Sequence, residues 1–408
     1  MYTVEGKEGA IICMSLALFC LGTWPALMTL LERRGRLPQH SYLDYSISNL
    51  LAAVIIALSF GQIGDSKTGI PNFITQLSQF QDNWPCVLFA LASGIVLSLG
   101  DLAVQFAWAF VGLSVTEVIA ASISVVIGST LNYFLDGRIN KAEVLFPGVG
   151  CFLVAVFLGF AVNSSNAADN KAKLNGFSNG CKTGTGTLDS PLLKETFENG
   201  DGTKDVENGN LLTEKTKVGT ADFLIEVENK RAIKVLGKSI LIGLSITFFA
   251  GVCFALFSPA FNLATNDQFH TMKEGVTHLA TYTAFFYFSV SFVIVAVVLN
   301  INFLYYPILG LPQSSLTAYL KDSCGRSWAL LAGLLCGFGN GFLFMGGQAA
   351  GYAAANAAQA FPLVATLWGI FLFGEYRRSS RRTYALLVSM LFMFVVAVGI
   401  LMASSGNR

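Results

Sequence analysis

The feature that most constrains this chain is a series of about ten apolar stretches, each long enough to cross a membrane. A helix needs roughly 20 mostly apolar residues to span about 30 Å of hydrocarbon. The stretches lie at residues 11–31, 42–63, 86–108, 111–134, 144–162, 239–262, 279–300, 328–346, 350–374 and 383–404. Runs such as 292–299 are continuously apolar, whereas strands of a membrane barrel alternate apolar and polar residues. The sequence therefore predicts an all-α integral membrane protein.

One long polar segment divides these stretches into two groups of about five. Residues 1–162 form a first five-helix unit and residues 239–408 a second. Residues 163–238 are rich in Asn, Gly, Thr and charged residues, which predicts a largely disordered cytoplasmic linker without a packed core. Within it, residues 222–238 mix apolar and charged side chains at helical spacing, which predicts a short amphipathic helix before the second unit.

The Lys and Arg residues predict an orientation, because loops rich in these residues stay in the cytoplasm. Those that can share one side with the central segment are Arg33, Arg34, Arg36, Lys321, Arg326, Arg377, Arg378, Arg381 and Arg382. The opposite side receives only Lys7, Lys67, Arg138, Lys141, Lys273 and Arg408. We therefore expect a cytoplasmic central segment and both termini outside.

The two units resemble each other weakly, as in transporters built from repeats. Pro25 and Pro259 fall at similar depths in the first helix of each unit. Gly94 and Gln105 match Gly337 and Gln348 at one constant offset. Because each unit has an odd number of helices, the second must enter the membrane from the opposite face. The pattern predicts two inverted repeats around a central cavity that opens to either side by rocking.

Several segments resemble known families. Residues 360–375, with an early Pro362 and a terminal Gly374-Glu375, resemble the ninth-helix signature of the drug/metabolite transporter superfamily. Over the whole chain, the segments 21–25, 98–102 and 131–138 resemble the plant ureide permeases. That resemblance implies proton-coupled uptake of allantoin and of related oxo derivatives of nitrogen heterocycles, such as uracil and xanthine, across the plasma membrane.

Two acids, Asp101 and Glu117, lie well inside the predicted helices. A charge at that depth is costly and marks a functional site by default. Both belong to one helical hairpin that turns near residues 109–112, and they lie roughly 15 and 9 Å from the turn at about 1.5 Å per residue. They can share one aqueous cavity. We predict that they bind and release the coupling proton, although an acid that only lines water or hydrogen-bonds a helix end would look the same.

A neutral, flat, amide-rich ligand needs paired donors and acceptors and an aromatic platform. Asn and Gln supply both donor and acceptor, and aromatic rings supply the platform. The predicted substrate-binding residues are Trp24, Asn49, Gln105, Asn132, Asn262, Asn340, Gln348, Asn356 and Gln359. For each amide alone, a hydrogen bond between helices that aids packing explains the residue equally well.

The segment from Ala232 to Gly237, Lys238 and Ser239 fits a relaxed phosphate-loop pattern, with Ala232 in place of the first Gly. A working phosphate loop lies between a strand and a helix of a nucleotide-binding domain. Here a linker precedes the motif and a membrane helix follows it. We expect a basic segment at the membrane border that touches lipid headgroups, and no cofactor besides the coupling proton.

Other functional classes fit less well. The three histidines lie in or beside loops without a metal-ligand partner, and the eight cysteines are scattered, so neither an enzyme nor a metal site is expected. The net charge of +1 argues against a nucleic-acid partner. The alternatives are a nucleotide-sugar or other metabolite exchanger, which would need Lys or Arg in its cavity, and an ATP-dependent transporter. Oligomeric state stays open.

Overall fold

The computed structural model describes residues 2, 4, 6–63, 71–183, 220–235, 239–270, 276 and 278–405, without the side chains of 174–183 and 221–225. Within these ranges all regular elements are helices. They are α1 (Gly6–Arg33), α2 (Pro38–Ser59), α3 (Phe73–Ser78), α4 (Phe80–Val111), α5 (Leu113–Leu135), α6 (Ala142–Thr183), α7 (Ala221–Lys230), α8 (Ile240–Asn266), α9 (Thr281–Tyr305), α10 (Leu316–Lys321), α11 (Arg326–Ala350), α12 (Tyr352–Ala355), the 3-10 helix η3 (Asn356–Ala360), α13 (Pro362–Phe373) and α14 (Arg381–Ala403).

Ten helical segments of the described chain are long and apolar enough to cross a membrane, the ninth being α12, η3 and α13 together. Large apolar side chains point outward from them. Phe157, Phe371 and Phe392 are 72%, 77% and 65% exposed, which suits contact with lipid but not with water. The predicted all-α, multi-pass membrane protein is confirmed.

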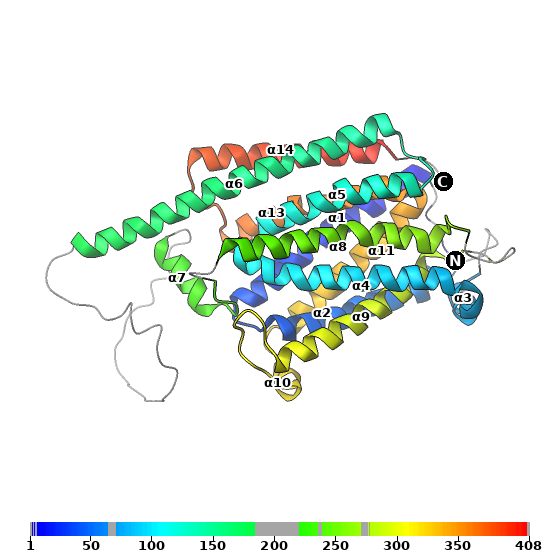
Figure 1. The fold of residues 1–408 in the computed structure, drawn as a ribbon, viewed down its shortest axis with the longest axis horizontal. Coiled ribbons are helices and arrows are strands. Elements are labelled where there is room, and N and C mark those ends of the chain that lie inside the picture. Colours follow the sequence, from blue (N-terminus) through cyan, green and yellow to red (C-terminus); the bar gives the residue numbers. More distant parts are fainter. Residues whose placement is uncertain are drawn as a thin grey trace.

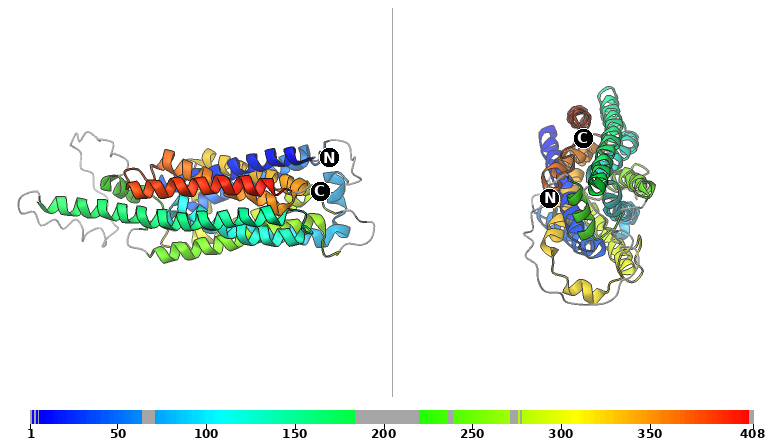
Figure 2. Two further views of the ribbon diagram at one scale, coloured as in Figure 1. Left: turned by 90° about the horizontal axis from the view of Figure 1, so that it is seen from above. Right: turned by 90° about the vertical axis from the view of Figure 1, so that its left-hand side faces the viewer.

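The long helices run side by side along one axis, and Figure 1 shows both chain termini at one end of the bundle and α7 at the other. The views in Figure 2 agree and show α6 extending beyond the bundle at this α7 end. The closest helix pairs join the two halves of the chain: α4 packs on α8, α1 on α11 and α6 on α14. The two halves therefore form one bundle.

Two similar glycine contacts connect the halves. In α4, Gly94 lies directly against the carbonyl oxygen of Phe288 and a serine three residues further along α9. In α11, Gly333 lies in the same way against the carbonyl oxygen of Tyr45 and a serine three residues further along α2. By these contacts Gly94 corresponds to Gly333. The sequence offset instead pairs Gly94 with Gly337, which lies one helical turn after Gly333. The inverted repeat itself stays a prediction.

The start of the central segment differs from the prediction. Residues 163–183 continue α6 as helix instead of beginning a disordered linker. Polar contacts to the start of α14 explain this: Asp169 accepts hydrogen bonds from the Ser380 backbone at 2.8 Å and the Thr383 hydroxyl at 2.7 Å. The predicted amphipathic helix exists as α7 but ends at Lys230. Residues 184–219 of the predicted linker lie outside the described residues.

Candidate functional site

A small cavity lies between α1, α4, α5, α8, α11 and η3, and its volume is about 20 Å³. We call it the central cavity; it is lined by Leu21, Trp24, Leu97, Asp101, Glu117, Phe254, Phe257, Cys336, Asn340, Gln359 and Phe361. It thus brings together five of the residues that the sequence predicts, namely both acids, one tryptophan and two amides. Its volume suits about one water molecule, so the helices are closed around the site in this structure.

The hairpin of α4 and α5 places the two acids. Gly112 joins the helices with a φ of +94°, a backbone conformation that favours glycine. Asp101 is 2% exposed and accepts a hydrogen bond from the Tyr45 hydroxyl at 2.6 Å. Glu117 is 1% exposed and accepts one from the indole N–H of Trp108. Within the described residues neither acid forms an ion pair, so neither is held permanently charged by a basic partner.

Aromatic rings connect the surroundings of the two acids. Trp24 stacks on Tyr45 with ring centroids 4.9 Å apart, and it meets Trp108 edge-on at 5.4 Å. The Tyr45 hydroxyl also lies 2.9 Å from the sulfur of Cys336. Sequence reasoning missed Tyr45, Trp108 and Cys336, because an aromatic residue or a cysteine in an apolar run is common in any membrane helix.

Three predicted amides lie elsewhere, in a hydrogen-bond network at the termini end of the bundle. Asn262 donates to Asn132 Oδ1 at 3.0 Å and to Asp136 Oδ1 at 2.8 Å. Gln348 accepts from the Tyr352 hydroxyl at 3.2 Å. None of the three lines the central cavity. Their contacts hold α5, α8, α11 and α12 together at this end.

The remaining predicted amides are also separate from the central cavity. Asn356 donates to Ser129 Oγ at 3.2 Å in α5. Asn49 is fully buried close to Gly337, and both polar atoms of its side chain lack a hydrogen-bond partner within the described chain. Gln105 lines a different small cavity beside Trp108.

A much larger cavity of about 530 Å³ opens at the α7 end, between α6, α7, the α4–α5 turn and the end of α13. We call it the vestibule. Trp108 is one of its lining residues, so the residue that hydrogen-bonds Glu117 also borders the vestibule. At its wall Arg33 pairs with Glu375 at 3.1 Å, and Ser114 donates to the same carboxylate at 2.6 Å.

The first residues of the phosphate-loop-like motif contact the end of α1. Ala232 N donates to the Glu32 carbonyl at 3.0 Å, and Ile233 N donates to its carboxylate at 3.1 Å. Arg231 adds two hydrogen bonds to the same carboxylate, at 3.1 and 3.2 Å. The backbone N–H groups of Ala232 and Ile233 are therefore already hydrogen-bonded and not free to bind a phosphate. Ser239 caps α8. Gly237 and Lys238 of the motif, which we expect at the lipid headgroups, lie outside the described residues.

Comparison with known proteins names the family. The model of the ureide permease family matches residues 41–404. The chain is 68% identical to ureide permease 1 and 67% identical to ureide permease 2 of Arabidopsis thaliana, in each case over all 408 residues and the whole of both chains. It is 63% identical to the probable ureide permease A3 of Vigna unguiculata, over 94% of this chain and all of that one. No solved structure matches. The chain belongs to the ureide permease family, and it is a membrane transporter and not an enzyme.

Proposed function

We propose that this chain is a proton-coupled secondary transporter that takes allantoin and related oxo derivatives of nitrogen heterocycles, such as uracil and xanthine, into the cell across the plasma membrane. The observation that carries the proposal is the central cavity itself. Two buried acids without an ion-pair partner in the described chain, Asp101 and Glu117, line it together with the amides of Asn340 and Gln359 and the ring of Trp24. The names of the relatives supply the substrate class.

The lining suits a neutral, flat ligand. Each amide offers a donor and an acceptor to alternating N–H and C=O groups, and Trp24 offers a face for stacking. No Lys or Arg occurs among the lining residues, so a phosphorylated ligand would find no cation. This disfavours a nucleotide-sugar exchanger.

Transport requires the cavity to open, because about 20 Å³ is far smaller than a heterocycle. The glycine contacts of Gly94 and Gly333, which match between the halves, support two similar units that rock against each other. A carboxyl group that binds a proton facing one side and releases it facing the other couples that motion to the proton gradient. We place both termini outside and the α7 end in the cytoplasm, where the loops rich in Arg lie.

Uptake of labelled allantoin and uracil into yeast expressing the chain tests the proposal. We expect faster uptake at external pH 5 than at pH 8 and loss of that difference with a protonophore. Glu117→Gln or Asp101→Asn should abolish the pH dependence. Asp82→Asn should keep it, because Asp82 is exposed at the start of α4, the helix that carries Asp101. A chain that reaches the plasma membrane without taking up either compound would contradict the substrate assignment.

A further inference from the structure

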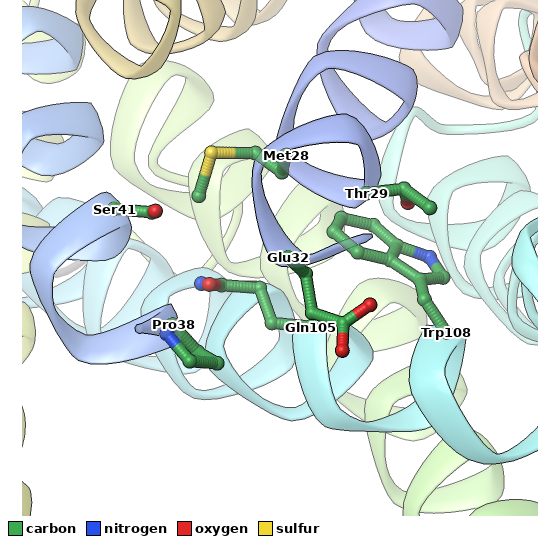
Figure 3. Close-up of a pocket in the computed structure, with 7 residues that line it drawn as sticks. All are labelled: Met28, Thr29, Glu32, Pro38, Ser41, Gln105 and Trp108. Carbon is green, nitrogen blue, oxygen red and sulfur yellow. The ribbon is translucent and has the colours of Figure 1, made fainter. Parts of the chain in front are cut away.

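A second small cavity lies beside the central one, and the proposed function does not use it. Its volume is about 10 Å³, and Figure 3 shows its lining. We call it the side cavity; it is lined by Met28, Thr29 and Glu32 of α1, Pro38 and Ser41 of α2, and Gln105 and Trp108 of α4. This volume is close to the minimum that holds one water molecule.

Three polar atoms around the side cavity have no hydrogen-bond partner in the described chain. They are the hydroxyl oxygens of Thr29 and Ser41 and the amide nitrogen of Gln105, and each residue is at most 4% exposed. Elsewhere in α1 the hydroxyl of Thr23 bonds to its own helix, at 2.7 Å from the Phe19 carbonyl. A buried polar group left unpaired destabilises the folded state. Such a cluster around one cavity indicates a polar ligand.

Trp108 connects this cavity with the other two. Trp108 lines both the side cavity, where Figure 3 shows its ring, and the vestibule, and its indole N–H bonds Glu117 in the central cavity. Glu32 forms another part of the wall, and Arg231 of the central segment holds its carboxylate. The side cavity therefore lies between the proposed substrate site and the α7 end of the bundle.

We propose that the side cavity is a release station for the substrate. It binds one water molecule while the helices are closed, and when α1 and α4 separate it offers its hydroxyls and amide to a carbonyl or N–H edge of the departing neutral ligand. Water and an amide edge present the same donors and acceptors, so either satisfies the three unpaired atoms. This inference rests on the proposed function for the identity of the ligand, whereas the binding of water in the side cavity does not depend on that function.

Hydroxyl-radical footprinting of the purified full chain by X-ray radiolysis tests the bound water. Radicals made from a bound water oxidise the side chain next to it, here Met28. Met345 is the matched control, because it is 5% exposed against 3% for Met28 and lines none of these three cavities. We expect Met28 to oxidise several-fold faster, and Ser41→Val, which fills the cavity, to remove the difference. Equal rates in the parent chain would overturn the water site.

Transport kinetics test the release step. Gln105→Leu and Thr29→Val should each lower the maximal uptake rate about fivefold, as expected from the loss of one hydrogen bond, with KM and equilibrium binding near the parent values. Thr29→Ser keeps the hydroxyl and should therefore keep the parent rate. Asn83→Leu is the control, since Asn83 is an equally buried, unpartnered amide at the other end of α4.

Parent-like rates in both variants would overturn the release step. Weakened equilibrium binding would overturn it too, because the residues would then belong to the central site. A parent chain that binds water in the side cavity and transports no ureide would contradict the proposed function and, with it, the release step, while leaving the hydrated cavity in place.

Discussion

The indole N–H of Trp108 donates a hydrogen bond to the carboxyl group of Glu117, across the turn that joins α4 and α5. Trp108 is 4% exposed, yet it borders the side cavity and the vestibule and touches Trp24 edge-on. One side chain thus separates the central cavity from the α7 end while contacting a candidate proton carrier. Movement of this ring would open the site and alter the surroundings of Glu117 in the same step.

Trp108→Phe keeps an aromatic ring in place and removes the N–H donor. Hydrogen bonds to charged groups contribute about 1.5–3 kcal/mol, so we expect the maximal uptake rate to fall by at least about tenfold. Trp84→Phe on the same helix is the control, because Trp84 is 54% exposed and should tolerate the change. Initial rates normalised to surface expression measure the effect. Equal rates for both variants would show that the N–H of Trp108 has no role.

Tyr45→Phe removes the hydroxyl that lies 2.6 Å from Asp101. We expect lower uptake at every external pH, because Asp101 loses its hydrogen-bond donor. Tyr42→Phe removes an equally buried hydroxyl that donates to the Ser98 carbonyl at 2.7 Å and should cost about 1 kcal/mol of stability, with uptake retained per folded molecule. Uptake assays and thermal unfolding in detergent separate the two effects. Loss of uptake in both variants would mean that packing, not Asp101, explains it.

Arg231→Gln weakens the attachment of the central segment to Glu32. The Arg231 side chain is only 11% exposed, so its loss leaves a buried carboxylate with fewer donors. We expect trypsin to cleave after Lys234 about tenfold faster, as a 1.4 kcal/mol easier local opening would give. Lys230→Gln breaks an exposed ion pair with Glu226 and should change the rate little. An unchanged rate for Arg231→Gln would contradict docking through this residue.

Asp322 should give a pH-dependent stabilisation at the α7 end. Burial acts to raise the pKa of Asp322, but a hydrogen bond with His40 at 2.8 Å and the charge of Arg36 outweigh it and hold that pKa below its usual value. A lowered carboxyl pKa stabilises the fold above about pH 4, and the effect is lost as the pH falls through the folded value. Asp322→Asn should therefore lower the Tm at pH 6 and show a shrinking difference below pH 4. A difference that grows on acidification would contradict the ion pair.

The fold followed from the sequence because hydropathy and length decide where a helix can cross a membrane. Composition failed at residues 163–183, where polar residues resemble a linker. Asp169 there hydrogen-bonds Ser380 and Thr383 in a segment more than 200 residues away, and no local pattern records such a contact.

The site could be predicted only in part. Asp101 and Glu117 stand out because a charge is rare inside an apolar helix, and the hairpin spacing brings them together. The sequence does not distinguish one amide from another, because Asn340 beside the central cavity and Asn262 in the network at the termini end lie in equally apolar runs. Tyr45 and Trp108 depend on how α1, α2 and α4 pack, which a single sequence does not contain.

Alanine substitutions at Gly94 and Gly333, the two matching glycines, distinguish an effect on helix packing from an effect on transport. A Cβ at Gly333 would overlap the carbonyl oxygen of Tyr45, so Gly333→Ala must displace α2 and the tyrosine that bonds Asp101. A Cβ at Gly94 would overlap the Phe288 carbonyl of α9, a helix without a lining residue in the central cavity. Both variants should lose about 1–3 kcal/mol of stability from overpacking.

Gly333→Ala alone should also lose uptake per folded molecule, measured as initial rate against surface protein. Gly150→Ala in α6 is the control, because a Cβ there has open space and alanine favours a helix. It should keep both the Tm and the uptake. If Gly94→Ala and Gly333→Ala lower uptake equally, the position of Tyr45 is not what limits transport, and the helix contact itself is.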